Sequence, residues 1–377
     1  MVFTTFESGG EWSGGSQVAG RDKTRRELLL EQIAYNSPTE TPLLSILPKV
    51  SVDSIMPEWT MGDIERTPDI DGDSESQDFS SSSFSGENRT RAGNYTHIKT
   101  RFVEISDTQR MMNEVGVQDE YSHQIWREML GLAIDFEYRL NFSTASFGTN
   151  ATPGTSDIRT MHGIWSWAQS TGKSTNTVTI AGHQLEVGTA AAPADYRSTW
   201  YEPATVTTLT RDLLYDEVLE PFWARGGEVD KSICFVGAGI KRTLSGFSQV
   251  YNAAGTEPVH KLNELGIAAS AKELFDTIDV YHSDCGTLHV SKNRYYNDVL
   301  TGSGAWYSSY GEGPISNFSP HKGMLIFEPR YMAIGVLEGM HVVPLAKTGL
   351  TTRALLGAQL TFICRNPKAI AAAYNVA

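Results

Sequence analysis

The most regular alternation of apolar and polar positions in the chain lies between residues 117 and 142. Apolar side chains recur there at helical spacing, and charged side chains occupy the other side. The apolar positions are Tyr121, Ile125, Met129, Leu132, Phe136 and Leu140. A helix of this length extends for about 39 Å. The pattern therefore predicts a rod along which one lobe of the protein is built.

Two segments alternate with the period of two that is typical of strands, and they cover residues 55–65 and 94–108. The polar, serine-rich tract between them has roughly thirty residues, far more than a usual hairpin loop. Neither face of the second segment is cleanly apolar, so we do not expect it in an ordinary sandwich. Because a strand pair without a core is marginal alone, we predict a hairpin-like arm that lies on a neighbouring subunit.

The first fifty residues have the pattern of an N-terminal arm. A short amphipathic helix is predicted over residues 21–36, with Leu28, Leu29, Leu30 and Ile33 on its apolar side. The prolines that follow, Pro38, Pro42 and Pro48, exclude a long regular element. An arm of this kind is not expected to bury its own leucines, so we expect it to need a partner surface.

The remainder of the chain mixes helix and strand signals and has no internal repeat. A helix over 203–227 is expected to be capped near Thr205 to Thr208 and closed at Gly226 and Gly227. The other expected elements are a short helix over 159–169, a strand or hairpin over 177–187, a strand over 231–239 followed by a helix over 240–253, a hairpin over 278–295, a strand over 322–337 and a long strand with a tail over 353–376.

Charge and composition narrow the possible functions. The 377 residues include 31 Lys and Arg against 44 Asp and Glu, which gives a formal net charge of −13. This balance argues against a protein that binds nucleic acid phosphates along its length. No secretory signal or bilayer-spanning apolar run is recognised, which predicts a cytosolic chain without membrane contact. Its three cysteines, Cys234, Cys285 and Cys364, are expected to be reduced, and mostly buried.

Three short motifs suggest ligand sites, and each lacks a residue that the chemistry needs. The "STGKST" stretch has Trp167 where a phosphate loop needs glycine, and "FVGAGIKRTLSG" has Arg242 at the third glycine position of a dinucleotide motif. The acidic "DIDGDSESQD" tract has Ser74 and Ser80 where a calcium loop needs a glycine and a bidentate carboxylate. Without a metalloprotease or serine-hydrolase motif, we predict no catalytic, cofactor or metal site.

Several stretches together resemble one known family. They are "PEWTMGDI", "RTRAGNYTHIKTRFVEISDTQRMMNEVG", "DFEYRLNF", "RTMHGIWSW" and "LAKTGLTTRALLGAQLTFICRNPKAIA". These stretches resemble tailed-phage major capsid proteins with the Hong Kong 97-like capsid fold, over roughly residues 27–170 and 325–372. The chain departs from the family pattern at His97, where glutamine is usual, at Asp107, where glycine is usual, and at Gln359, where glutamate is frequent.

The resemblance implies an α+β fold with four kinds of region. These are an N-terminal arm over 1–50, an extended β-hairpin loop over 51–107, a peripheral domain with a long spine helix over 108–205 and 322–377, and an inserted axial domain over 206–321. In that fold the arm and the loop reach adjacent subunits, so a neighbour supplies the surface that the loop lacks. The expected intersubunit contacts are Trp59, Tyr95 and Phe102 as anchors, and Arg89 and Arg91 as partners of a neighbour's carboxylates or as a solvated surface pair.

The implied function is that of a major capsid protein. Its copies would form hexamers and pentamers of an icosahedral shell that encloses double-stranded DNA without sequence-specific binding, assembled in the host cytoplasm and carried in the virion. A portal, and a separate scaffolding or decoration protein, are the other expected partners. Two alternatives stay open, namely a nanocompartment shell protein of the same fold and an α/β enzyme with an unrecognised site.

Two expectations concern maturation. About fifty residues precede the loop, so we expect no long scaffolding segment that is later cleaved from this chain. No lysine lies between Lys49 and Lys99, and an arginine guanidinium stays protonated and is a poor nucleophile. We therefore expect shells held by noncovalent contacts alone, without a cross-link from a lysine on the loop.

Overall fold

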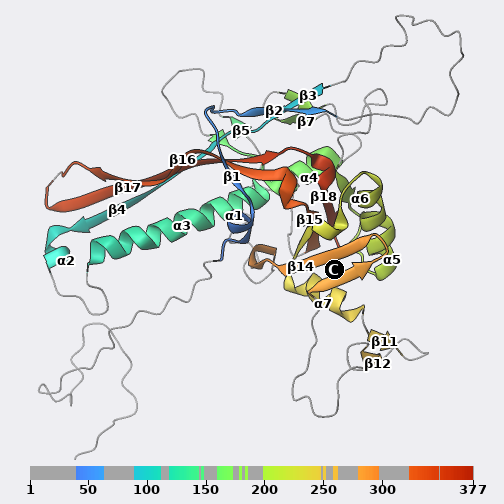
Figure 1. Cartoon of the computed structure of the whole chain (residues 1–377). Helices are drawn as coiled ribbons and strands as arrows, with labels where there is room; N and C mark the ends of the chain where they lie inside the picture. Colours follow the sequence, from blue (N-terminus) through green and yellow to red (C-terminus); the bar gives the residue numbers. More distant parts are fainter. Residues whose placement is uncertain are drawn as a thin grey trace, which may run out of the picture.

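The structure is a computed structural model in which two sheets and one long helix organise the chain (Figure 1). The described residues are 40–62, 89–111, 119–143, 146–147, 159–172, 178–180, 183–185, 198–247, 249–251, 258–261, 279–296, 322–347 and 349–376. The predicted helix over 21–36 and the tract from Asp69 to Asn88 lie outside these residues.

The long helix α3 (Glu120–Phe142) confirms the prediction for residues 117–142. Asp119 caps its first turn, because its carboxylate accepts hydrogen bonds from the amides of Tyr121 and Ser122. The apolar face divides between two clusters. Tyr121, Ile125 and Met129 pack beneath the outer end of a sheet, and Leu132, Phe136 and Leu140 enter the main core.

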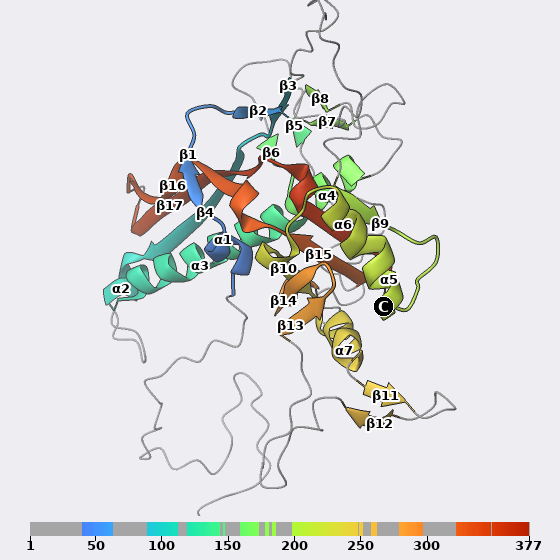
Figure 2. The same ribbon diagram turned by 45° about the vertical axis from the view of Figure 1, so that its right-hand side comes forward.

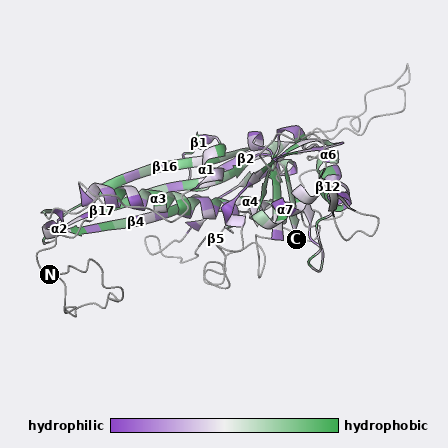
Figure 3. Cartoon of the chain, turned by 90° about the horizontal axis from the view of Figure 1, so that it is seen from below, coloured by the Kyte–Doolittle hydropathy of each residue, from purple (hydrophilic) through white to green (hydrophobic). Residues whose placement is uncertain are grey.

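The sheet above α3 has four strands in the order β1–β16–β17–β4. Their bounds are β1 (Lys49–Ser51), β16 (Met332–Leu345), β17 (Thr351–Cys364) and β4 (His97–Ser106). The short β1 is parallel to β16, whereas the three long strands are antiparallel. Figure 1 shows α3 running along one face of these long strands. Figure 3 shows hydrophobic and hydrophilic segments interspersed along the helix and along the strands.

The prediction that residues 94–108 form the returning limb of the hairpin-like arm is wrong in its pairing. β4 pairs with β17 over ten positions, from Thr351 opposite Ser106 to Leu360 opposite His97. Its face toward α3 buries Val103 and Ile105, and Arg101 reaches the acidic side chains of the helix. Polar residues on this face are matched by partners on α3, so the strand has a core surface that alternation alone did not indicate.

A second sheet has six strands in the order β13–β14–β10–β15–β18–β9. The bounds are β13 (Val280–Ser283), β14 (Gly286–Lys292), β10 (Ile233–Val236), β15 (Gly323–Phe327), β18 (Ile370–Tyr374) and β9 (Thr199–Tyr201). These strands come from both the expected axial region and the expected peripheral regions. The hairpin expected over 278–295 is confirmed as β13 and β14.

The two faces of this sheet carry different cores. Alternate residues of β10 point to opposite sides: Phe235 joins the main cluster with α3 and α4 (Ile164–Gly172), and Cys234 and Val236 join a second cluster. That second cluster packs under α5 (Arg211–Leu214), the π-helical turn Tyr215–Leu219, α6 (Glu220–Ala224) and α7 (Ala238–Gly246). Figure 2 shows α5, α6 and α7 gathered on one side of the molecule.

The helix expected over 203–227 is shorter than its pattern indicated. Thr210, and not one of the threonines at 205–208, provides the cap, accepting from the amide of Leu213 at 3.2 Å. The helical run ends at Ala224, and Gly226 follows with φ 94°, a conformation that favours glycine. The strand expected over 231–239 is confirmed as β10, and the helix expected over 159–169 is confirmed as α4. The helix expected over 240–253 is confirmed only in its first half, because α7 ends at Gly246 and residues 249–251 form a strand.

The remaining described elements are short. They are α1 (Pro42–Ile46), β2 (Glu58–Gly62), β3 (Arg89–Gly93), α2 (Asp107–Met111), β5 (Ser146–Phe147), β6 (Arg159–Thr160), β7 (Val178–Ile180), β8 (His183–Leu185), β11 (Gln249–Tyr251), β12 (Pro258–Lys261) and the 3-10 turns Val229–Lys231, Arg294–Tyr296, Pro329–Tyr331 and Pro367–Ala369. Among the described helices, none is long and apolar enough to cross a membrane.

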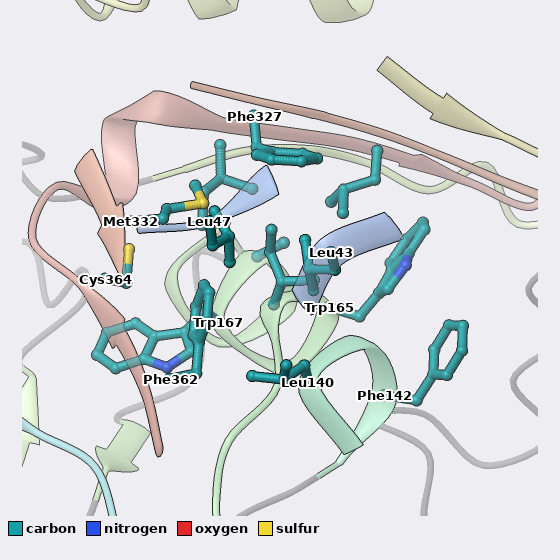
Figure 4. Packing of buried hydrophobic residues seen from close by; sticks show 14 of the residues in the cluster. Leu43, Leu47, Leu140, Phe142, Trp165, Trp167, Phe327, Met332, Phe362 and Cys364 are labelled. Carbon is teal, nitrogen blue, oxygen red and sulfur yellow. The ribbon is translucent and has the colours of Figure 1, made fainter. Parts of the chain in front are cut away.

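The main core is rich in large side chains from distant parts of the sequence (Figure 4). Trp165 and Trp167 of α4 are fully buried. Gly163 precedes them at a close contact, because a Cβ there would lie 2.7 Å from the carbonyl oxygen of Arg139 in α3. Leu43 and Leu47 from the N-terminal region enter the same core. The expectation that the arm cannot bury its own leucines is therefore wrong for these two.

Candidate subunit-contact surfaces

The described residues offer no recognisable centre for catalysis or metal binding. No group of three or more His, Cys, Asp or Glu side chains is placed to hold a metal ion within them. An open polar cleft of about 420 Å³ lies between α5 and β13. Two of its polar side chains serve the local turn, since Ser283 donates to the carbonyl of Gly286 at 2.9 Å and His282 contacts Thr287 at 3.1 Å. The three cysteines form no disulfide, and Cys234 and Cys364 are buried.

The stem of the expected extended loop is the pair β2 and β3. These strands are antiparallel, with Glu58 opposite Gly93 and Gly62 opposite Arg89. Residues 63–88, which connect them, lie outside the described part of the chain. The stem begins beside the start of β4 and lies apart from α3 (Figure 1). Two antiparallel strands of this size cannot form a core alone, so their root needs an anchor.

Asn94 anchors the root of the stem within the subunit. Its side-chain amide nitrogen donates to the carbonyls of His162 at 3.0 Å and Phe362 at 2.7 Å, and its oxygen accepts from the His162 amide at 2.9 Å. The residue is fully buried. It thus joins the stem to the segment before α4 and to β17. Sequence reasoning missed Asn94, and the only signal was an asparagine at the start of the second alternating segment.

The predicted anchors Trp59 and Tyr95 lie against their own subunit. The Trp59 indole nitrogen donates to the carbonyl of Cys364 at 2.8 Å, and its ring centre lies 5.8 Å from that of Trp167. Tyr95 is half-buried against the same core. Both side chains hold the root of the stem, which is a different role from direct contact with a neighbour.

The predicted arginines lie on β3. Arg91 pairs with Glu58 across the stem at 3.3 Å, and its side chain is 65% exposed. Arg89 is placed by its backbone, opposite Gly62, and its side chain is not among those described. The structure thus brings Trp59, Tyr95, Arg89 and Arg91 together around the stem, whereas the fifth predicted contact lies elsewhere.

Phe102, the fifth predicted contact, lies on the outer face of the four-stranded sheet and is 69% exposed. Strand register places it opposite Leu355 of β17, which in turn lies opposite Val343 of β16. Val343 is 40% exposed, and Leu355 is half-buried. We call these three residues the outer row. Ile98 on β4 and Leu345 on β16 are further exposed apolar residues on these strands.

The opposite face of β4 is joined to α3 by a charge cluster. The Arg101 guanidinium donates to Asp135 at 2.9 and 3.0 Å and to Glu128 at 2.8 Å. Gly131 makes room for it, because a Cβ at that position would lie 2.7 Å from a guanidinium nitrogen. Burial raises the pKa of Glu128, but the hydrogen bonds from Arg101 and Arg127 outweigh it and hold the pKa below its usual value.

A second buried carboxylate holds the N-terminal segment. Glu137 of α3 accepts from the amides of Leu43 and Leu44 at 2.9 and 2.8 Å. Asn141 donates to it at 3.2 Å. Burial raises the pKa of Glu137 to about 7, although these hydrogen bonds oppose the shift. Sequence reasoning missed this residue, and its one signal was an acidic side chain beside Phe136 on the apolar face.

Comparisons with known proteins give this arrangement a family. The fold is similar to solved phage capsid subunits. The cyanophage A-1(L) capsid is 12% identical with a TM-score of 0.62, and the match covers 93% of this chain and 97% of that chain. The native GTA particle capsid is 9% identical with a TM-score of 0.55, covering 94% and 96%. The mature capsid of bacteriophage PhiM1 is 8% identical with a TM-score of 0.54, covering 93% and 92%. No curated protein matches the sequence significantly.

The chain therefore has the α+β Hong Kong 97-like capsid fold, which defines a class of shell subunits. The model of the SU10 major capsid protein family matches residues 3–377, so the chain belongs to that family. It is a structural protein of a phage capsid, and this sets aside the enzyme alternative. Several copies of the chain assemble in such a shell.

Proposed function

We propose that the chain forms hexamers and pentamers that close into an icosahedral shell around the double-stranded DNA of a tailed phage. The observation that carries this proposal is the outer row, an apolar strip left bare on a subunit whose other sheet face is closed by α3. Contiguous exposed apolar area of this kind marks interaction surfaces. A second copy of the chain is the occupant that a shell provides.

The contacts within the subunit indicate the bounds of the segments that we propose reach neighbours. We place the extended loop at residues 53–96, because β1 and β4 belong to the four-stranded sheet. The N-terminal arm is residues 1–39, and residues 40–52 are fixed on the subunit. The peripheral domain is 97–205 with 322–377, and the axial domain is 206–321, with one sheet shared between them.

The predicted contact residues take two roles in this proposal. Phe102 contacts a neighbouring copy directly, whereas Trp59 and Tyr95 hold the stem so that the loop leaves the subunit in a fixed direction. Arg91 serves both roles: it pairs with Glu58 within the stem, and most of its side-chain surface stays exposed to a neighbour. Arg89, beside it on β3, is proposed to meet a carboxylate of the adjoining chain.

The other partners follow from the chemistry of a shell. The net charge of −13 supports an inner surface that encloses DNA without holding its phosphates. A portal and a separate scaffolding or decoration protein are proposed partners, with assembly in the host cytoplasm. The shell is proposed to be held without a lysine cross-link, so denatured particles should give a single band at the monomer mass.

The experiment is electron microscopy of shells from wild type and from Phe102→Asp. The substitution places a charge in the outer row, so we expect soluble folded subunits that fail to form shells. Val206→Asp is the matched control, since Val206 is exposed to 47% outside the outer row. Normal shells from Phe102→Asp would refute the proposed contact. Small uniform cages from wild type would indicate the nanocompartment alternative.

A further inference from the structure

Residues 40–52 form a strap that crosses from the axial side of the subunit to the four-stranded sheet. At its start, Glu40 pairs with Arg294 at 3.1 Å, and its carbonyl accepts from the Tyr295 hydroxyl at 3.2 Å. At its end, β1 pairs with β16, and the amide of Val52 donates to the carbonyl of Val336 at 3.1 Å. In the sequence, the strap follows residues 1–39 and precedes the stem of the loop.

The centre of the strap rests on Glu137. The two amides that donate to its carboxylate belong to Leu43 and Leu44, the second and third residues of α1. This short helix has no side-chain cap of its own. Glu137 is fully buried, as is Leu43 beside it. The carboxylate therefore loses its water when the strap is seated and regains it when the strap lifts.

Within the described part of the chain, no cation compensates the charge of Glu137. Its polar partners are neutral donors, namely two backbone amides and the side chain of Asn141. Lys99 and Arg101 of β4 pair with Asp135, and Arg139 of α3 lies close to His97. The titratable groups near Glu137 among the described residues are Tyr295 and Tyr296 on the 3-10 turn, since burial and, after it, the charge of Glu137 raise the pKa of both hydroxyl groups.

A chain of buried hydrogen bonds extends from this point into the main core. Asn141 accepts from the Tyr296 hydroxyl at 3.0 Å, and that hydroxyl accepts from the indole nitrogen of Trp165 at 2.7 Å. Gly237 at the start of α7 lies against the same tyrosine, since a Cβ there would be 2.1 Å from the carbonyl oxygen of Tyr296. The seat of the strap is thus joined by hydrogen bonds to α3 and α4.

We propose that Glu137 is a pH-sensitive latch, which holds the strap when its carboxyl group is protonated and loosens it when the group is ionised. The consequence for assembly rests on the proposed function: a loosened strap frees the roots of both segments that reach neighbours. The latch itself is a property of the single subunit. It needs no bound ligand and no second chain.

The direction follows from the two states of the strap. With the strap seated, burial raises the pKa of Glu137 from its ordinary value near 4.5 to about 7. With the strap lifted, the carboxyl group meets water and returns toward the ordinary value. The seated state therefore binds more protons, so rising pH disfavours it. For these two pKa values, the equilibrium constant for seating the strap falls by about thirtyfold between about pH 5.5 and about pH 8.5.

The test is hydrogen exchange of the full-length unassembled subunit at these two pH values, read by mass spectrometry and corrected for intrinsic exchange. We expect protection of the strap peptide to fall by roughly ten- to thirtyfold at the higher pH. Peptides from the middle of α3 serve as the internal reference and should keep their protection. Equal strap protection at both pH values in wild type would overturn the proposal.

Two variants separate titration from general weakening. Glu137→Gln cannot ionise, so its strap protection should change by less than about twofold with pH, from a lower starting level because the amide accepts one hydrogen bond fewer. Glu40→Gln removes an exposed carboxylate of the same strap and should retain the wild-type response. A wild-type response in Glu137→Gln would overturn the latch. If strap protection in wild type depends on pH but wild type forms no shells under any condition, the latch stands and the proposed function is refuted.

Discussion

The two faces of the four-stranded sheet differ in what covers them. The face toward α3 buries Val103, Ile105 and Leu356 and joins Arg101 to the helix, whereas the opposite face presents the outer row to solvent. Neighbouring residues of one strand thus have opposite environments. The chain supplies the cover for one face from its own sequence and leaves the other to a second copy.

The largest expected effect comes from placing a charge on the inner face. Leu356 is 1% exposed, so Leu356→Asp buries an unpaired carboxylate, and we expect the free energy of unfolding to fall by about 4 kcal/mol or more. Leu355→Asp, one residue away on the outer row, should cost less than about 1 kcal/mol. Urea denaturation of both variants measures the contrast, and equal losses would remove the distinction between the faces.

The root of the stem should behave like the inner face. Asn94→Ala removes three buried hydrogen bonds, and we expect a loss of about 3 kcal/mol in urea denaturation. Asn366→Ala is the matched control, because Asn366 makes one local bond to the amide of Lys368 and should cost about 1 kcal/mol. If the two variants lose the same stability, Asn94 is not the anchor of the stem.

The charge cluster under β4 should contribute less, because Arg101 keeps 32% of its side chain exposed. Arg101→Met retains much of the aliphatic part of the side chain but leaves Glu128 and Asp135 without their shared cation. We expect the free energy of unfolding to fall by about 2 kcal/mol. Since the pKa of Glu128 is lowered in the fold, the stabilisation is present above its ordinary value and is lost as pH falls through the lowered one.

The difference between wild type and Arg101→Met should accordingly shrink in acid. Arg353→Met is the control on the outer side of the sheet, where Arg353 pairs with the exposed Glu104 at 2.8 Å. We expect no measurable change in stability from that variant. A constant difference between pH 7 and acid would show that the cluster does not act through the ionised glutamate.

The smallest expected effect concerns Trp59. Trp59→Phe keeps most of the ring contact with Trp167 but removes the indole donor to the carbonyl of Cys364, at a cost of about 1 kcal/mol. Trp223→Phe, at an indole that is 60% exposed, is the control and should leave stability unchanged. A shift for Trp223→Phe as large as for Trp59→Phe would count against the anchor role.

Elements with a local signal were predictable from the sequence. The apolar period and the Asp119 cap define α3, and the hairpin of β13 and β14 follows from two short alternating runs joined at a tight turn. The family was also recognisable from "NYTHIKTRFVEIS" and the closing stretches, which the whole-chain family match bears out. These features depend on neighbours within a few residues along the chain.

What the sequence did not reveal depends on distant partners. The strand β4 pairs with β17, about 250 residues away in the printed sequence, and its charged Arg101 looks misplaced until Glu128 and Asp135 are beside it. Leu43 and Leu47 are buried only because α3 and the sheet meet there. Asn94 and Glu137 are single polar residues whose partners are backbone groups, and backbone partners leave no pattern in side chains.

The most direct measurement is hydroxyl-radical footprinting of Phe102 in unassembled subunits and in complete shells. In the subunit this ring is 69% exposed, so it should be oxidised readily. We expect its oxidation to fall by about fivefold or more in the shell, because a second copy covers the outer row. Oxidation of Phe102 at the same rate in shells and in subunits would contradict the account.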